Sequence, residues 1–141
     1  MSSSAEQSHP KLLIIEDHYE TKTFLTMALG DDYDVDTATN AKQAWKLAEQ
    51  TTYDLLLVDI ALRDEVDGIT LVAQLREDPR YVGVPMIATT AHQHYEEEEF
   101  YLTHGFDAYL AKPYYPEMLL KLIEELLADG GDPDRDHRPH L

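Results

Sequence analysis

The chain has 141 residues, the usual length of one domain and enough to bury a hydrophobic core. It contains no cysteine, which excludes disulfide bonds and thiolate chemistry and fits a cytoplasmic protein. The formal net charge is −17, and because an acidic chain repels phosphate backbones, we expect no direct binding to nucleic acid.

The two ends of the chain differ in composition from its middle. Residues 1–9 are rich in serine, and residues 129–141 mix glycine, proline and charge, so neither end buries enough apolar surface to order itself. The N-terminus lacks the apolar segment of a signal peptide, and the longest apolar runs have only the length of strands. We expect one domain over residues 10–128, two disordered tails and no membrane insertion.

Short apolar runs alternate with amphipathic stretches through the middle of the chain. The expected elements, in chain order, are a strand over residues 11–15, a helix over 21–29, a strand over 33–38, a helix capped by Asn40, a strand over 54–60, a helix after Gly68, a strand over 84–89, a helix over 95–104, a strand over 108–111 and a helix that ends near Gly130. Strands that alternate with helices predict an α/β fold, in which helices cover both faces of a parallel sheet.

Polar residues collect where the predicted strands end. Glu16 and Asp17 follow the first strand, Asp59 lies near the end of the third, Thr90 follows the fourth, and Lys112 follows the fifth. In parallel sheets of this kind, ligands bind at the carboxyl ends of the strands. Three carboxylates close together repel each other unless a cation holds them, and oxygen ligands favour Mg²⁺.

The same set of residues favours phosphoryl transfer to a carboxylate. Asp59 is the best candidate for the nucleophile, because a central strand would hold it rigidly. Lys112 would supply positive charge to the phosphoryl oxygens, and Thr90 would supply a hydrogen bond.

Over about residues 10–128 the sequence resembles the receiver domains of response regulators, the partners of sensor histidine kinases in two-component systems. The resemblance rests on motifs in a fixed order: Glu16–Asp17, Asp59 within YDLLLVDIAL, Asp67–Gly68, Thr90–Ala91 after PMIAT, Gly105, and Lys112–Pro113. It implies a flavodoxin-like, doubly wound sheet of five parallel strands in the order 2-1-3-4-5, with five helices.

The resemblance also implies a metal site. Asp59 matches the phosphoacceptor of the family, Asp17 its direct Mg²⁺ ligand, and Glu16 the companion acid that acts through water. The backbone carbonyl of Ala61 matches a further ligand, and Mn²⁺ is expected to substitute for Mg²⁺. Two departures bear on this site: the first acid is Glu16, and the loop after Asp59 is one residue longer than usual, with Arg63 in place of a common proline.

A conformational switch is implied as well. Thr90 and Lys112 match the residues that grip the phosphoryl oxygens, and Tyr109 matches the aromatic residue that turns inward when the threonine moves. Family members are signalling proteins rather than ordinary enzymes, since they catalyse only their own phosphorylation and dephosphorylation. Ala61 and His92 occupy the positions on which the rate of dephosphorylation depends.

The implied partners are a sensor histidine kinase or a phosphotransfer protein, and an output protein that the sequence does not name. No DNA-binding or enzymatic segment follows Leu127, so we expect output through protein contacts of the fourth helix, fifth strand and fifth helix, or a relay role. The acidic run at residues 96–99 fits a basic partner surface. Apolar residues off the core stripe of the last helix fit a homodimer seam, namely Met118, Leu120 and Leu127.

Alternative interpretations remain beside the switch. A pseudo-receiver would bind partners without ever reacting. A flavin protein, a phosphatase of the haloacid-dehalogenase type and a P-loop nucleotidase each need a motif that the sequence lacks. We expect His18 and His92 to be surface residues near the site and not metal ligands.

Overall fold

The computed structural model describes residues 9–62, 66–91 and 95–129. In chain order the elements are β1 (Lys11–Ile15), α1 (Tyr19–Leu29), β2 (Asp34–Ala38), α2 (Ala41–Gln50), β3 (Leu55–Asp59), α3 (Gly68–Leu75), the short 3-10 helix η1 (Pro79–Tyr81), β4 (Met86–Thr90), α4 (Tyr95–Thr103), β5 (Ala108–Ala111) and α5 (Pro116–Asp129). Some predictions fall on residues that the structure does not describe. These are the predictions for the two tails and for Arg63, His92, Gly130 and the side chains of residues 96–98.

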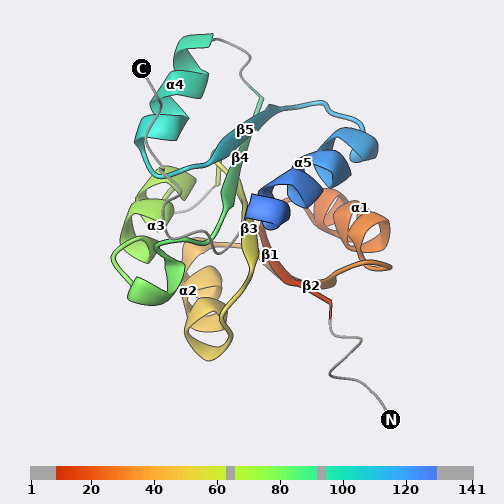
Figure 1. Ribbon diagram of the computed structural model, residues 1–141, viewed down its shortest axis with the longest axis horizontal. Helices are drawn as coiled ribbons and strands as arrows, with labels where there is room; N and C mark the ends of the chain where they lie inside the picture. The colour runs from red at the N-terminus through yellow and green to blue at the C-terminus, as the bar shows by residue number, and fades with distance from the viewer. Residues whose placement is uncertain (1–8, 63–65, 92–94, 130–141) are drawn as a thin grey trace.

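The five strands form one parallel sheet in the order β2-β1-β3-β4-β5, as the resemblance predicted. Figure 1 shows α1 and α5 together on one side of the sheet, with α2 and α3 on the other. The predicted α/β class and strand order are therefore confirmed. Among the described residues, the longest helix is α5 with 14 residues, and none of the helices has the length and apolar character needed to span a bilayer.

Successive side chains of the central strand β3 point to opposite faces of the sheet. Leu55 and Leu57 of β3 pack in the cluster with α1 and α5, whereas Leu56 and Val58 pack in the cluster with α2 and α3. All four are at most 3% exposed, so β3 is buried on both faces, as its apolar run predicts. Burying each such side chain contributes about 1.5–3 kcal/mol, which strongly specifies the register of the sheet.

One predicted local signal, the cap of α2, is confirmed, and two residues of the family motifs have local roles that were not predicted. The Asn40 side chain accepts a hydrogen bond from the Gln43 backbone N–H at 2.9 Å and caps α2. Asp67 caps α3 in the same way through the Thr70 N–H, at 2.8 Å. Gly105, before β5, has a φ of 102°, a conformation that favours glycine.

Two predicted bounds are off by two residues, and η1 was not predicted. Helix α1 begins at Tyr19 because the Lys22 N–H already bonds to the His18 carbonyl, at 3.0 Å. Strand β4 begins at Met86 because Val84 still belongs to the turn after η1, where its carbonyl accepts a hydrogen bond from Arg76.

Arg76, one residue past α3, ties together the segments that lead into β4 and β5. Its guanidinium donates to the carbonyl oxygens of Tyr81 (2.6 Å), Val84 (2.7 Å) and Gly105 (2.7 Å). It also pairs with Asp107 at 2.9 Å, and that carboxylate accepts the Met86 N–H. The two paired side chains are only 14% and 4% exposed, so the charges satisfy each other inside the fold.

We expect Arg76→Met to lower the free energy of unfolding by about 3–5 kcal/mol, because it leaves the Asp107 carboxylate buried without its counter-charge. Urea denaturation of both proteins measures the difference. Arg80→Met is the control: Arg80 forms an exposed ion pair with Asp78, and its loss should change stability much less. Equal losses in the two variants would contradict a structural role for Arg76.

Candidate functional site

The acidic residues lie where the order of the strands reverses. After β1 the chain crosses to β2 on one side and later to β3 on the other, so a crevice is expected between the carboxyl ends of β1 and β3. Glu16 and Asp17 directly follow β1, and Asp59 ends β3. The backbone holds the edge in register, since the Glu16 N–H donates to the Ala38 carbonyl at 2.9 Å.

Lys112 contacts two of these acids. Its ammonium nitrogen Nζ lies 3.2 Å from Oε1 of Glu16 and 3.5 Å from Oδ2 of Asp59. The Glu16 and Asp59 side chains are each only 3% exposed, whereas that of Lys112 is 27% exposed. The charges therefore interact at the rim of the buried core, where solvent screens them weakly.

The donor set fits a divalent cation. Glu16, Asp17, His18 and Asp59 each place one ligand atom so that all of these atoms lie within 4.8 Å of one another. Carboxylate oxygens at such spacing suit a hard ion such as Mg²⁺. Receiver domains bind Mg²⁺ at an acidic pocket, and this cluster occupies the corresponding edge of the sheet.

The structure also describes the remaining predicted site residues, which are Ala61, Thr90 and Tyr109. The Ala61 N–H donates to Oδ1 of Asp59 at 3.0 Å, which orients the carboxylate. Thr90 ends β4, is 1% exposed, and its carbonyl accepts the Lys112 N–H at 2.7 Å. Tyr109, within β5, is half-buried and stacks on Tyr101 of α4 with ring centroids 5.4 Å apart.

The surroundings shift the pKa values of the two buried acids, Asp59 and Glu16, in opposite directions. Burial raises the pKa of the Asp59 carboxyl and the nearby Glu16 charge raises it further, against the opposing Ala61 N–H and Lys112. Burial also acts to raise the pKa of Glu16, but the hydrogen bond with His18 and the charge of Lys112 outweigh it and leave the pKa lowered. The cluster thus lacks positive charge, which a divalent cation would supply.

Two residues near the acids were not assigned to the site from the sequence. His18 lies against Glu16 and Asp17, with Nδ1 2.8 Å and 3.1 Å from their oxygens. Burial and the charges of Glu16 and Asp59 raise the pKa of Tyr114 to about 12, so its phenol stays protonated near the site. The only sequence signal for either residue is its nearness to a motif, Glu16–Asp17 or Lys112–Pro113.

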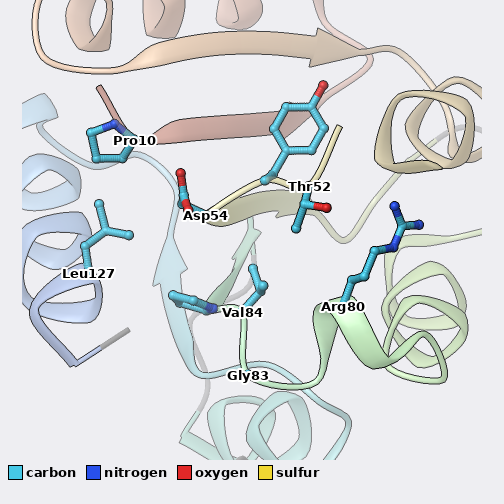
Figure 2. Close-up of a pocket in the computed structure, with 9 residues that line it drawn as sticks. Pro10, Thr52, Asp54, Arg80, Gly83, Val84 and Leu127 are labelled. Carbon is cyan, nitrogen blue, oxygen red and sulfur yellow. The ribbon is translucent and has the colours of Figure 1, made fainter. Parts of the chain in front are cut away.

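A cavity lies at the opposite edge of the sheet, away from the acids. This cavity of about 500 Å³ lies between the amino ends of β3 and β4 and the end of α5. Figure 2 shows residues that line it, among them Asp54, Val84 and Leu127. Its charged side chains are engaged within the fold, because Asp54 accepts the Lys11 N–H at 2.7 Å and Arg80 pairs with Asp78 at 2.8 Å. The chemistry therefore concentrates at the carboxyl edge of the sheet.

The comparison with protein families agrees with this geometry. The model of the response regulator receiver domain matches residues 12–124. The chain belongs to this family. It is thus a signalling module of the type used in two-component systems, where phosphorylation switches the state of the receiver domain.

Curated relatives of this receiver domain include proteins of very different length. An uncharacterized 14.6 kDa protein of Leptolyngbya boryana is 36% identical over 115 residues, covering 81% of this chain and 87% of the relative. The response regulator Rre1 of Synechocystis is 32% identical over 83% of the chain, and the transcriptional regulatory protein CusR of Escherichia coli is 37% identical over 85%. The chain spans about half the length of these last two relatives, 51% and 52%.

Solved structures share the fold closely. The receiver domain of the Francisella response regulator 1452 superposes with a TM-score of 0.78 at 26% identity, covering 85% of this chain and 98% of that one. A CheY-like receiver domain protein of Methanospirillum hungatei gives the same TM-score at 28% identity, with 86% and 96% coverage.

Gly68 packs directly against the carboxyl end of β3 in this receiver domain. A Cβ atom at this position would lie 2.8 Å from the backbone oxygen of Asp59 and 2.9 Å from Cγ1 of Val58. Backbone cannot yield as a flexible side chain does, so the start of α3 can approach β3 this closely only with glycine. The structure thereby gives a physical reason for the glycine of the Asp67–Gly68 motif.

We expect Gly68→Ala to lower the free energy of unfolding by about 1–3 kcal/mol, the usual cost of overpacking, and to displace the end of β3. Urea denaturation measures the first effect, and the backbone amide chemical shifts of Asp59 and Ala61 measure the second. Gly83→Ala is the matched control, since an added Cβ there meets nothing within 4 Å. An unchanged Asp59 amide in Gly68→Ala would refute the close-approach argument.

Proposed function

We propose that this receiver domain accepts a phosphoryl group on Asp59 from a sensor histidine kinase or a phosphotransfer protein, with Mg²⁺ bound at the acidic cluster. The observation that carries the proposal is the position of Lys112, whose Nζ lies 3.5 Å from Oδ2 of Asp59 beside acids whose ligand atoms lie within 4.8 Å of one another. A nucleophilic carboxylate, a lysine and a cation site thus share one crevice.

The transfer itself needs alignment more than proton removal, because a carboxylate already carries the attacking electron pair. An oxygen of Asp59 forms the bond to phosphorus, and the bond from phosphorus to the donor atom breaks with its electrons left on the donor. The Ala61 N–H, 3.0 Å from Oδ1, holds the carboxylate in orientation. Lys112 and the Thr90 hydroxyl stabilise the phosphoryl oxygens.

In this proposal Asp17, Asp59 and the Ala61 carbonyl hold the metal ion directly, and Glu16 acts through water. Mn²⁺ substitutes for Mg²⁺ in the same role. The bound ion supplies charge that neutralises the phosphoryl oxygens as the bond to the donor lengthens.

Room for the donor exists beside the lysine. A cavity of about 340 Å³ is lined by Lys112, Pro113 and Tyr114 on one side and by Phe24 and Thr21 of α1 on the other. Its mainly apolar walls suit the ring or acyl part of a phosphoryl donor, while Lys112 faces the transferred group.

The signal would pass from the site to α4 through β5. Thr90 ends the neighbouring strand, and Tyr109 is stacked on Tyr101, a residue of α4 that is only 5% exposed. A shift of Thr90 toward the phosphoryl group would therefore change the packing of Tyr109 and move α4. We propose that an output protein reads this change on the surface made by α4, β5 and α5, where Phe100 is 43% exposed.

We propose that the receiver domain spans residues 10–128 and acts in the cytoplasm, where its kinase partner would phosphorylate it. A homodimer through α5 stays a prediction: Met118 is 50% exposed, whereas Leu120 and Leu127 pack partly against the core of their own chain.

We expect acetyl phosphate and Mg²⁺ to increase the mass of the protein by one phosphoryl group, and Asp59→Asn to abolish the increase, because the amide is not a nucleophile. Intact-mass spectrometry measures the adduct. Asp54→Asn is the matched control, since Asp54 precedes the same strand at its opposite end and should leave the adduct intact. An unreactive wild-type protein would favour the pseudo-receiver interpretation.

We expect Thr90→Ala to uncouple phosphorylation from the switch, because the variant keeps Asp59 and Lys112 but loses the hydroxyl that moves. The nuclear magnetic resonance signals of the Tyr109 ring, assigned with Tyr109→Phe, should shift on phosphorylation in the wild type and stay fixed in Thr90→Ala. Thr90→Ser, which retains a hydroxyl, should restore the shift. A full response in Thr90→Ala would rule out this route.

A further inference from the structure

The His18 side chain turns toward the acidic cluster and away from the helix that it precedes. His18 is the N-cap residue of α1, with an extended backbone (φ −92°, ψ 119°), yet its imidazole makes no capping hydrogen bond. Its Nδ1 instead lies 2.8 Å from Oε2 of Glu16 and 3.1 Å from Oδ1 of Asp17. The Glu16 carboxylate also accepts the His18 backbone N–H at 3.1 Å, which fixes the turn between the two residues.

We propose that His18 supplies an imidazole nitrogen to the divalent cation of this cluster, so that the site prefers a first-row transition ion such as Mn²⁺ over Mg²⁺. The inference rests on the cation site of the proposed function and goes beyond it in naming a nitrogen ligand and an ion preference. It also departs from the expectation drawn from the sequence, in which His18 was a surface residue near the site but not a metal ligand.

The spacing of the atoms supports coordination. An octahedral ion with bonds of about 2.1 Å places neighbouring ligands about 3.0 Å apart. The distance from His18 Nδ1 to Oδ1 of Asp17, a direct ligand in the proposed function, is 3.1 Å and agrees with that value. All four candidate ligand atoms, including one from Asp59, lie within 4.8 Å of one another.

The chemistry of the ligand decides the preference. Mg²⁺ takes oxygen ligands and gives up its water reluctantly, so an imidazole adds little to its binding. Imidazole suits transition ions, whose affinity for a nitrogen-containing site rises along the first row from Mn²⁺ toward Cu²⁺. Adding one imidazole to the Asp17 and Asp59 carboxylates therefore strengthens the binding of Mn²⁺ more than the binding of Mg²⁺.

A competing arrangement uses the same contacts differently. The His18 side chain is 52% exposed, so it has room to leave the cluster, and its ring N–H can simply hydrogen-bond to the carboxylates. In that case the imidazole blocks the cation site, and removing it should raise the affinity for every divalent ion together.

The test compares ion binding in wild type, His18→Gln and Asp17→Asn, with His9→Gln as the control for an exposed histidine at the other end of β1. Glutamine keeps a hydrogen-bonding group but has no imidazole nitrogen. Calorimetric titration gives the affinities for Mn²⁺ and Mg²⁺, and electron paramagnetic resonance of bound Mn²⁺ detects a directly coordinated nitrogen through its hyperfine coupling.

We expect His18→Gln to weaken Mn²⁺ binding about tenfold, the lower end of what losing a side chain that supports a metal costs, and to leave Mg²⁺ binding within about twofold. The nitrogen coupling should be present in wild type and His9→Gln, and absent in His18→Gln and Asp17→Asn. Absence of the nitrogen coupling in the wild-type protein would overturn the inference even if a variant failed to fold. A parallel change in the Mn²⁺ and Mg²⁺ affinities of His18→Gln would overturn it as well.

Phosphorylation of the wild-type protein, measured in parallel with acetyl phosphate and Mg²⁺, keeps the two ideas apart. A normal phosphoryl adduct together with no nitrogen coupling overturns only the role of His18. If the wild-type protein forms no adduct and binds no Mg²⁺, the proposed function is overturned, and the inference falls with it.

Discussion

Charge compensation at the carboxyl edge of the sheet is the constraint on which this receiver domain depends. Lys112 contacts Glu16, 96 residues earlier in the chain, at 3.2 Å and Asp59 at 3.5 Å. Both acids are nearly fully buried, and a buried carboxylate is costly without a counter-charge. Lys112 brings one positive charge to a cluster of three carboxylates and contacts two of them, so the cluster is short of positive charge and favours a cation.

The fold brings these groups together by burying both faces of the central strand. Because β3 has core on both sides, it cannot slip by one residue without moving Leu56 and Val58 into the wrong cluster. Asp59 is therefore fixed at the end of a rigid element, and Gly68 lets α3 pack directly against it. The Asp59 carboxylate owes its position to apolar packing several residues away.

A different ion pair, between Arg76 and Asp107, stabilises the opposite edge of the sheet. Arg76 and Asp107 bind the turns that enter β4 and β5, the two strands that end in Thr90 and Ala111. In the proposed function these strands carry the signal from the site to Tyr109 and α4. Arg76 and Asp107 fix the amino ends of β4 and β5, whereas the carboxyl ends carry polar residues. This arrangement suits strands whose carboxyl ends change packing while their amino ends stay in place.

The sequence by itself determined the alternation of strands and helices, the parallel sheet and the set of residues at its carboxyl edge. These features follow from local patterns, such as the apolar run of β3 and the cap at Asn40, and from motifs in a fixed order. Only the tertiary structure decided which neighbours these residues meet. The carbonyl partners of Arg76, the backbone behind Gly68 and the turn of His18 toward Glu16 join groups through strand register and loop geometry, and no local pattern along a single chain records those contacts.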